Sequence, residues 1–93
     1  MMIIVAGKLY VRPGTHPEFL ARSADAMAQA RRAAGCEDFV VAADPIEDDR
    51  VNVFEAWTTR AELEAFRGSE PDDGLGALIV RAAVAEYEVA ADG

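Results

Sequence analysis

The sequence predicts an α+β domain in which strands and helices follow one another in the order β-α-β-β-α-β. Two observations lead to this prediction. Apolar, β-branched segments alternate with amphipathic segments of helical period, and each change of period coincides with a turn or helix-start signal. The chain of 93 residues is long enough for one small domain and leaves no room for a second. We therefore expect a single domain over residues 1–90 and a short tail at residues 91–93.

The first strand is expected over Met2–Val11, which is apolar and β-branched and ends at an Arg-Pro-Gly turn signal at residues 12–14. Its odd positions are uniformly apolar. Its even positions are apolar except for Lys8 and Tyr10, which share one face. Both faces of this strand are therefore mostly apolar and expected to be buried, which is unusual in so small a domain.

An amphipathic helix is expected to follow. Thr15 and Glu18 have the spacing of a capping box, in which the threonine accepts from the third helical amide and the glutamate reaches back. Pro17 is tolerated in a first helical turn because the first amides have no partner within the helix. Apolar residues then recur at helical spacing as far as Ala34, and Gly35 is the expected stop.

Residues 36–43 and 50–57 read as two strands of a hairpin, joined by the acidic turn at residues 44–49. The acids of this turn imitate the ends of a calcium loop, but Ile46 and Asp49 stand where a ligand and a glycine are required. We therefore interpret these acids as a solvated turn.

A second capping box, Thr59 with Glu62, starts a shorter helix. Residues 68–74 interrupt it, residues 75–79 add at most one helical turn, and Val80–Val89 forms the last strand. The acidic stretch at residues 70–73 is expected to be a charged loop, with a lid over a cavity mouth as the alternative.

This element order is that of the ferredoxin-like fold. Right-handed crossovers place both helices on one face of a four-stranded antiparallel sheet. The opposite face would then have no cover, although each strand carries apolar or aromatic groups on that side. Monomers rarely expose an apolar surface of this size. We therefore predict a homodimer in which two sheets pack face to face and enclose a cavity in each subunit.

Composition excludes several classes of function. Nine Lys and Arg against seventeen Asp and Glu give a net charge of −8, which repels nucleic acids and anionic membranes. One cysteine, Cys36, and one histidine, His16, exclude an internal disulfide framework and a Cys/His zinc site. The apolar stretches are too short to cross a membrane, and residues 1–5 lack the features of a secretory signal. We expect a cytoplasmic protein.

Several short segments, taken in order, resemble a known family. They are the turn at residues 12–14, Ala34-Gly35-Cys36, Asp44-Pro45, and Phe54-Glu55-Ala56-Trp57 running into Thr59–Leu63. From Met2 to Val89 their order and spacing resemble the antibiotic biosynthesis monooxygenase family, whose members are small dimeric α/β barrels. The resemblance implies a substrate held between the helices and the inner surface of the sheet.

The resemblance also implies an activity. It is the oxidation of a phenolic or quinol-type, polyketide-like aromatic by molecular oxygen, with no cofactor and no metal. An ionised phenol is electron-rich enough to reduce oxygen, so the protein has mainly to deprotonate, orient and desolvate it.

The sequence departs from the family pattern at its histidines. Phe66 stands at the position of the first family histidine, and residues 69–72 replace a Ser-Pro-His-Phe segment. Gly7 stands where haem-degrading members carry an asparagine, which disfavours haem degradation. Two further functions therefore stay open: a non-catalytic dimeric barrel that binds a small apolar ligand, and a polyketide cyclase or isomerase.

Trp57, Tyr10 and Glu55 are the candidate catalytic residues. Trp57 forms either an aromatic wall for a planar substrate or a packing group at the strand-to-helix corner. Tyr10 could bind an acidic phenol with the help of Lys8, or lie at the rim. A buried Glu55 would have a raised pKa and could act as a base. Alternatively, Glu55 forms an ion pair across the dimer with one of the arginines at positions 50 and 81.

Lys8, Asn52 and Phe66 are the candidate pocket residues. A buried Asn52 amide needs partners, so it either faces a ligand or lies near the end of the hairpin. His16, in the first turn of a helix, is expected to be a surface residue. Cys36 has no basic neighbour to activate it and is expected to be an inert, packed thiol.

Overall fold

The computed structural model describes residues 1–69 and 75–90. Its elements follow the predicted order. They are β1 (Met2–Val11), α1 (His16–Arg31), β2 (Cys36–Ala43), β3 (Arg50–Trp57), α2 (Arg60–Ser69), the short 3-10 helix η1 (Leu75–Leu78) and β4 (Ile79–Val89). The predicted lid at residues 70–73 and the tail at residues 91–93 lie outside the described residues.

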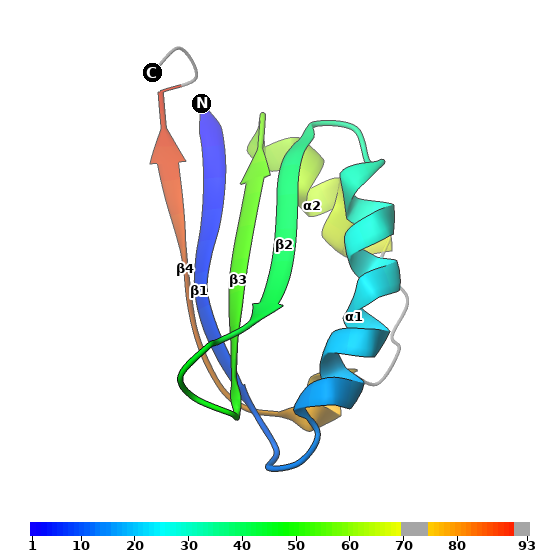
Figure 1. The fold of residues 1–93 in the computed structure, drawn as a ribbon. Coiled ribbons are helices and arrows are strands. Elements are labelled where there is room, and N and C mark those ends of the chain that lie inside the picture. Colours follow the sequence, from blue (N-terminus) through cyan, green and yellow to red (C-terminus); the bar gives the residue numbers. More distant parts are fainter. Residues whose placement is uncertain (70–74, 91–93) are drawn as a thin grey trace.

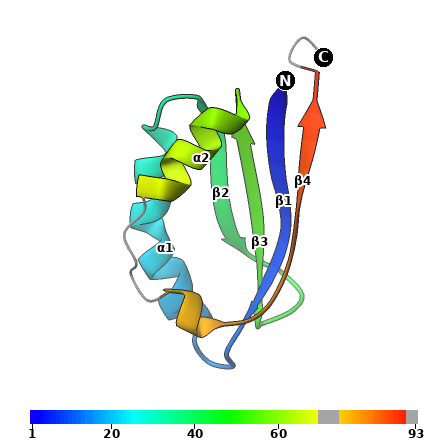
Figure 2. The same cartoon turned by 180° about the vertical axis from the view of Figure 1, so that it is seen from behind.

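The predicted fold class is confirmed. The four strands form one antiparallel sheet in the order β2-β3-β1-β4. Both helices lie on the same side of this sheet, and β4 forms the edge farthest from β2 (Figures 1 and 2). In the described parts of the chain, no helix is long and apolar enough to span a membrane.

The predicted capping box at the start of α1 is wrong. The Thr15 hydroxyl donates to the Arg12 carbonyl at 2.6 Å, and its oxygen caps no helical amide. An N-cap side chain normally reaches the helical amides from a β-region backbone, whereas Thr15 already has helical angles (φ −99°, ψ −1°). Glu18 turns instead to Arg22, one turn later, at 3.0 Å. The threonine half of the second box is present, because the Glu62 amide donates to the Thr59 hydroxyl at 3.2 Å. The Glu62 carboxylate accepts from the Thr59 hydroxyl at 3.1 Å.

Helix α1 ends at Arg31, three residues before the predicted Ala34. The Arg32 and Ala33 amides bond to carbonyls three residues back, so the last turn tightens and closes. Gly35 then reverses the chain with φ +83°. A side chain at this position would collide with the carboxylate of Glu62, so glycine also allows α2 to begin close to this turn.

The hydrophobic core lies between the helices and the sheet. Odd-numbered residues of β1 and β3 point into it, as the strand period of two requires. The buried residues are Ile3, Val5, Ala30, Phe39, Trp57, Leu63 and Phe66 in one cluster and Val11, Phe19 and Val51 in a second. Helix α2 is therefore anchored over β1 and β3 by two side chains, Leu63 and Phe66.

The opposite face, which we call the open face, is not covered by any helix of the described chain (Figures 1 and 2). The even positions of β1 lie here, with Ile4 between Ala56 and Tyr87 and with Ala6 beside Phe54. The Phe54 residue is 40% exposed and Tyr87 is 54% exposed. Strand β4 is exposed along nearly its whole length. The protomer therefore presents a broad, partly aromatic sheet surface.

Gly7 allows the close approach of β1 and β4. Its φ is +156°, which L side chains rarely adopt. A Cβ built on Gly7 would overlap the Ala83 carbonyl and lie 2.7 Å from the Cα of Val84. Both obstacles are backbone atoms of the neighbouring strand, so a side chain here could be accommodated only by moving the strand.

We expect Gly7→Ala to lower the free energy of unfolding by more than about 1 kcal/mol, because the backbone conformation and the β4 backbone both oppose a side chain. Gly68→Ala is the matched control, since a Cβ there meets nothing within 4 Å and lies in α2. It should gain about 0.4–1 kcal/mol. Urea denaturation measures both changes. A Gly7→Ala protein as stable as the wild type would contradict the close approach.

Candidate functional site

The strand register divides the six predicted site residues between the two faces of the sheet. Lys8 pairs with Asn52, and Tyr10 with Arg50, on the open face. Glu55 pairs with Val5, and Trp57 with Ile3, on the helix side, where Phe66 meets them from α2. The sheet therefore separates Tyr10 from Trp57 and Phe66, and the expected pocket containing all three is not formed within one protomer.

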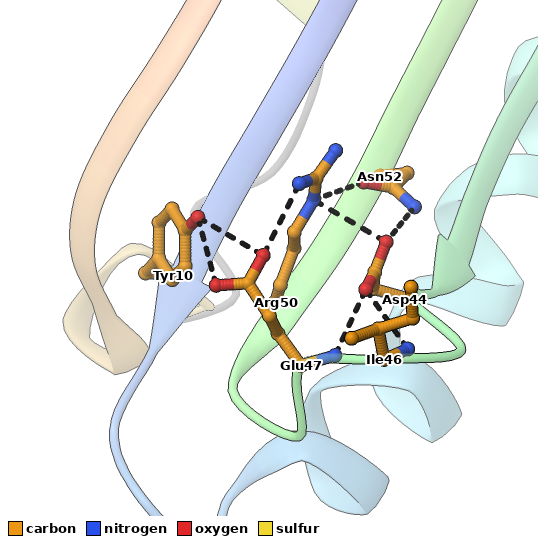
Figure 3. A network of polar contacts seen from close by, with 6 residues as sticks. All are labelled: Tyr10, Asp44, Ile46, Glu47, Arg50 and Asn52. Carbon is orange, nitrogen blue, oxygen red and sulfur yellow. Dashed lines mark hydrogen bonds and ion pairs between the residues drawn. The ribbon is translucent and has the colours of Figure 1, made fainter.

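The open-face residues belong to a polar network at the end of the β2–β3 hairpin (Figure 3). The Tyr10 hydroxyl donates to the two Glu47 carboxylate oxygens at 3.3 and 3.4 Å. Arg50 donates to Glu47 at 3.2 Å and to the Asn52 carbonyl oxygen at 2.7 Å. The Asn52 amide group then donates to Asp44 at 3.0 Å. Asn52 thus lies at the hairpin end, one of the two places that the sequence left open for it.

Asp44 is the centre of this hairpin network. Besides Asn52, the backbone amides of Ile46 and Glu47 donate to its carboxylate at 3.0 and 2.9 Å (Figure 3). The bond from Asn52, followed by the amide bonds, lowers the pKa of Asp44 to about 2. The carboxylate is therefore ionised at neutral pH and fixes the conformation of the turn. This supports the interpretation of the acids as a turn.

Tyr10 is flanked by two cations. The Arg81 guanidinium lies 4.2 Å from the centre of its ring, and the Lys8 ammonium lies 5.9 Å from it. These distances are those of cation–π contacts. Lys8 therefore faces the ring of Tyr10, while the tyrosine hydroxyl is directed to Glu47.

On the helix side, Glu55 and Trp57 are bonded to each other. The Trp57 indole N–H donates to Glu55 Oε1 at 3.0 Å. Trp57 is 0% exposed, and its ring lies 5.3 Å from that of Phe66, which in turn meets Phe39 edge-on at 5.9 Å. Trp57 thus fills the strand-to-helix corner, and the aromatic packing fixes the direction of its N–H toward Glu55.

The Glu55 carboxyl group is half-buried. Burial raises the pKa of Glu55 above its ordinary value, and Glu86 adds to the rise. The Trp57 hydrogen bond and the charge of Arg67 oppose it. Within the protomer, Arg67 is a cation whose charge acts on Glu55. The arginines at positions 50 and 81, expected to pair with Glu55 across the dimer, are strand partners of Tyr10 on the other face of the same protomer.

Arg67 and Arg60 both bind Glu86. Arg67 donates to one oxygen of the Glu86 carboxylate at 2.9 Å, and Arg60 donates to the other oxygen at 2.8 Å. These bonds lower the pKa of Glu86. Glu55 and Glu86 are the two neighbours of Val5 in the sheet, so both carboxylates lie on the helix side, one on each flank of β1.

Sequence reasoning missed Arg60, Arg67 and Glu86. A signal was present, because Arg60 and Arg67 are seven residues apart and therefore share one face of a helix. Their partner was not indicated, since it depends on the pairing of β4 with β1.

Cys36 fits the structural role expected for it, whereas the expectation that His16 is a surface residue is wrong for its ring nitrogen. Cys36 lies at the start of β2, where its thiol contacts the Asp38 carbonyl at 3.5 Å and burial raises its pKa. His16 is the first residue of α1, and its Nε2 is buried with no hydrogen-bond partner among the residues described. Across residues 1–69 and 75–90, no three His, Cys, Asp or Glu side chains converge as a group that could hold a metal ion.

Comparison with known proteins gives one family and many similar structures. The family model of the antibiotic biosynthesis monooxygenases matches residues 2–71. An uncharacterized protein of Synechocystis sp., sll1783, is 36% identical over 62 residues, which cover 67% of this chain and only 42% of that protein. The chain thus spans less than half the length of this curated relative.

Two solved structures show the same fold. One is a provisionally named antibiotic biosynthesis monooxygenase from Nitrosomonas europaea, with a TM-score of 0.84 at 16% identity, covering 92% of this chain and 88% of that one. The other is a similarly named protein from Chloroflexus aurantiacus, with a TM-score of 0.79 at 24% identity, covering 100% and 98%. At these identities the likeness concerns the fold.

The raised pKa of Glu55 predicts a pH-dependent stability. Unfolded Glu55 releases its proton near the ordinary value of 4.5, whereas the folded protein holds the proton to a higher pH. The folded state therefore binds more protons in this window, and the contribution of Glu55 to stability falls as the pH rises through it. Glu55→Gln keeps an acceptor for the Trp57 indole N–H and has no proton to lose, so its stability should not fall in this pH window through residue 55.

We therefore expect the free energy of unfolding of Glu55→Gln, relative to wild type, to be higher at about pH 8 than at about pH 4. Urea denaturation at both pH values measures the difference. Glu18→Gln, a change at an exposed carboxylate of α1, is the control. An equal difference at both pH values for Glu55→Gln would show that burial does not perturb this group.

Proposed function

The chain belongs to the antibiotic biosynthesis monooxygenase family, and from this premise we propose that it oxidises a phenolic or quinol-type aromatic with molecular oxygen, without a metal or an organic cofactor. The observation that carries the proposal is the half-buried Glu55 carboxylate, held by the Trp57 indole N–H on the helix side of the sheet. A carboxylate whose pKa is raised is a stronger base than an exposed one.

In the proposed reaction, Glu55 takes the proton of the phenolic hydroxyl and leaves an electron-rich phenolate. The phenolate then transfers electrons to oxygen. For an anthrone-type substrate, which has a phenolic tautomer, a ring CH₂ group becomes a carbonyl group. One oxygen atom enters the product and the other leaves as water with the two hydrogens. The substrate supplies all four electrons, so the reaction needs no external reductant.

We also propose that the active form is a homodimer in the cytoplasm, with the open faces of two sheets packed together. The exposed Phe54, Tyr87 and Val89 support this, because a second copy would remove their aromatic and aliphatic surface from water. The hairpin network then lies at one end of the interface. Glu55 faces away from it, so each protomer carries its own reacting group.

A non-catalytic ligand-binding barrel is the second candidate function. Phe66, at the position of the first family histidine, is packed between Trp57 and Phe39 in the core. A buried phenyl ring provides apolar surface and cannot transfer a proton. A protein that binds an aromatic molecule without reacting with it, or folds a polyketide chain for cyclisation, needs only such a surface.

We expect the wild type to consume oxygen in the presence of some member of a panel of anthrones and hydroquinones, faster than a protein-free solution does. Glu55→Gln should lower kcat/KM by about 100-fold or more, the usual contribution of a general base, while Glu18→Gln keeps the activity. In the wild type, kcat/KM should rise with pH as Glu55 loses its proton.

Oxygen uptake by Glu55→Gln at the wild-type rate would contradict the role of Glu55. Protection against thermal unfolding by a panel member, with no oxygen uptake, would support the binding protein instead. A loss of activity in Tyr10→Phe without loss of the dimer would move the reaction to the open face.

We expect Phe54→Asp to weaken the dimer by about 30-fold or more, as the loss of a central apolar contact does. Ala28→Asp is the matched control, because Ala28 is exposed on α1, on the other side of the sheet. Sedimentation at low micromolar concentration distinguishes one chain from two. A wild-type protein that sediments as a folded monomer would contradict the proposed assembly.

A further inference from the structure

We infer that Arg67 stabilises the ionised substrate, and that its bond to Glu86 holds its guanidinium group near Glu55 for this purpose. This inference rests on the proposed function and deepens it. It assigns the residue that receives the negative charge created when Glu55 removes a phenolic proton.

The geometry begins with the sheet. Glu55 on β3 and Glu86 on β4 both pair with Val5, so they lie on opposite flanks of β1 and on the same face. Neighbouring strands are about 4.8 Å apart. Glu55 and Glu86 are therefore two strand spacings apart, roughly 10 Å. Arg67 binds Glu86 at 2.9 Å, and its charge acts on Glu55 from that position.

The charge balance of this site changes during proton transfer. Before transfer, Arg67 is bonded to the Glu86 carboxylate, and its charge also acts on Glu55. After transfer, Glu55 is a neutral acid and the phenolate carries the negative charge. Arg67 then faces an anion that was absent from the ground state, which is the arrangement that stabilises developing charge.

The guanidinium has donors left for this role. It carries five N–H groups, and the bond to Glu86 uses its Nη1. The Arg67 side chain is 44% exposed to solvent. An incoming phenolate oxygen can therefore bind Arg67 without displacing Glu86.

Arg60 provides a matched comparison on the same helix. It binds the other oxygen of Glu86 at 2.8 Å and is also 44% exposed. Arg60 lies seven residues before Arg67, about 10 Å along the helix axis, and Glu86, Glu88 and Glu64 raise its pKa. Removing either arginine thus breaks one bond to Glu86, but only the loss of Arg67 removes the charge next to Glu55.

The test uses 4-nitrophenol, whose ionised form absorbs at a longer wavelength than the neutral form. A pH titration of the protein-bound phenol gives its ionisation constant in wild type, Arg67→Gln, Arg60→Gln and Arg67→Lys. Glu55 from β3 and Glu86 from β4 also titrate on this face, and replacing Arg67 raises the pKa of both. The same arginine variants are therefore also titrated in a Glu55→Gln background, where position 55 carries no titratable group.

We expect Arg67→Gln to lower the ionisation constant of the bound phenol by about tenfold or more, which corresponds to one pKa unit. Arg60→Gln should lower it by less than about threefold, and Arg67→Lys should restore part of the loss because it keeps the charge. Urea denaturation confirms that the variants are folded.

An equal fall of the ionisation constant in Arg67→Gln and Arg60→Gln would overturn the inference, since both arginines would then only bind α2 to β4. An unchanged ionisation constant in Arg67→Gln would overturn it as well. If the ionisation constants follow the expected order but no substrate causes oxygen uptake, the role of Arg67 stands and the oxygenase proposal is contradicted. No saturable binding of the phenol to wild type would overturn both.

Discussion

The pairing of β1 with β3 on one side and β4 on the other decides what every strand residue in this protein can contact. Antiparallel partners share a face, so the row Glu55–Val5–Glu86 points to the helices and the row Arg50–Tyr10–Arg81 points away from them. A shift by one residue in either pair would exchange the two faces. Gly7 is needed for the pairing of β1 with β4, because a side chain at this position would overlap the β4 backbone.

Helix α2 connects the core to the charged site. Leu63 and Phe66 anchor it by burial, and Arg60 and Arg67 tie it to β4 through Glu86. The first attachment is independent of salt, whereas exposed ion pairs are screened and contribute little to stability. The arginines therefore matter more for the electrostatic field beside Glu55 than for the free energy of unfolding.

The polar groups on the two faces of the sheet differ in how far their hydrogen bonds are satisfied. On the open face, Asp44, Asn52, Arg50 and Glu47 satisfy one another and fix the hairpin turn, so their polar atoms are engaged before any ligand arrives. On the helix side, the hydrogen bond described for the Glu55 carboxyl group comes from Trp57, and burial raises its pKa. A half-buried carboxyl group with a raised pKa is typical of a reacting site.

The sequence by itself determined the element order, the strand and helix positions to within a few residues, and the presence of an uncovered apolar face. These follow from local patterns, namely period two in residues 2–11, helical spacing after Thr15, and the capping box at Thr59. It also placed Glu55 and Trp57 on one side of a strand, since they are two residues apart. Local patterns did not reveal that the Thr15 hydroxyl turns back to Arg12, because this depends on the backbone angles at the helix start.

Only the tertiary structure decided which face each strand turns to the helices. It thereby separated Tyr10 from Trp57 within the protomer, and it placed Arg67 of the same chain where its charge acts on Glu55. The reason is physical. One unbroken register pairs Tyr10 with Arg50 and Trp57 with Ile3, which puts Tyr10 and Trp57 on opposite faces. The register between strands far apart in the chain is set by their mutual packing, which no single segment encodes.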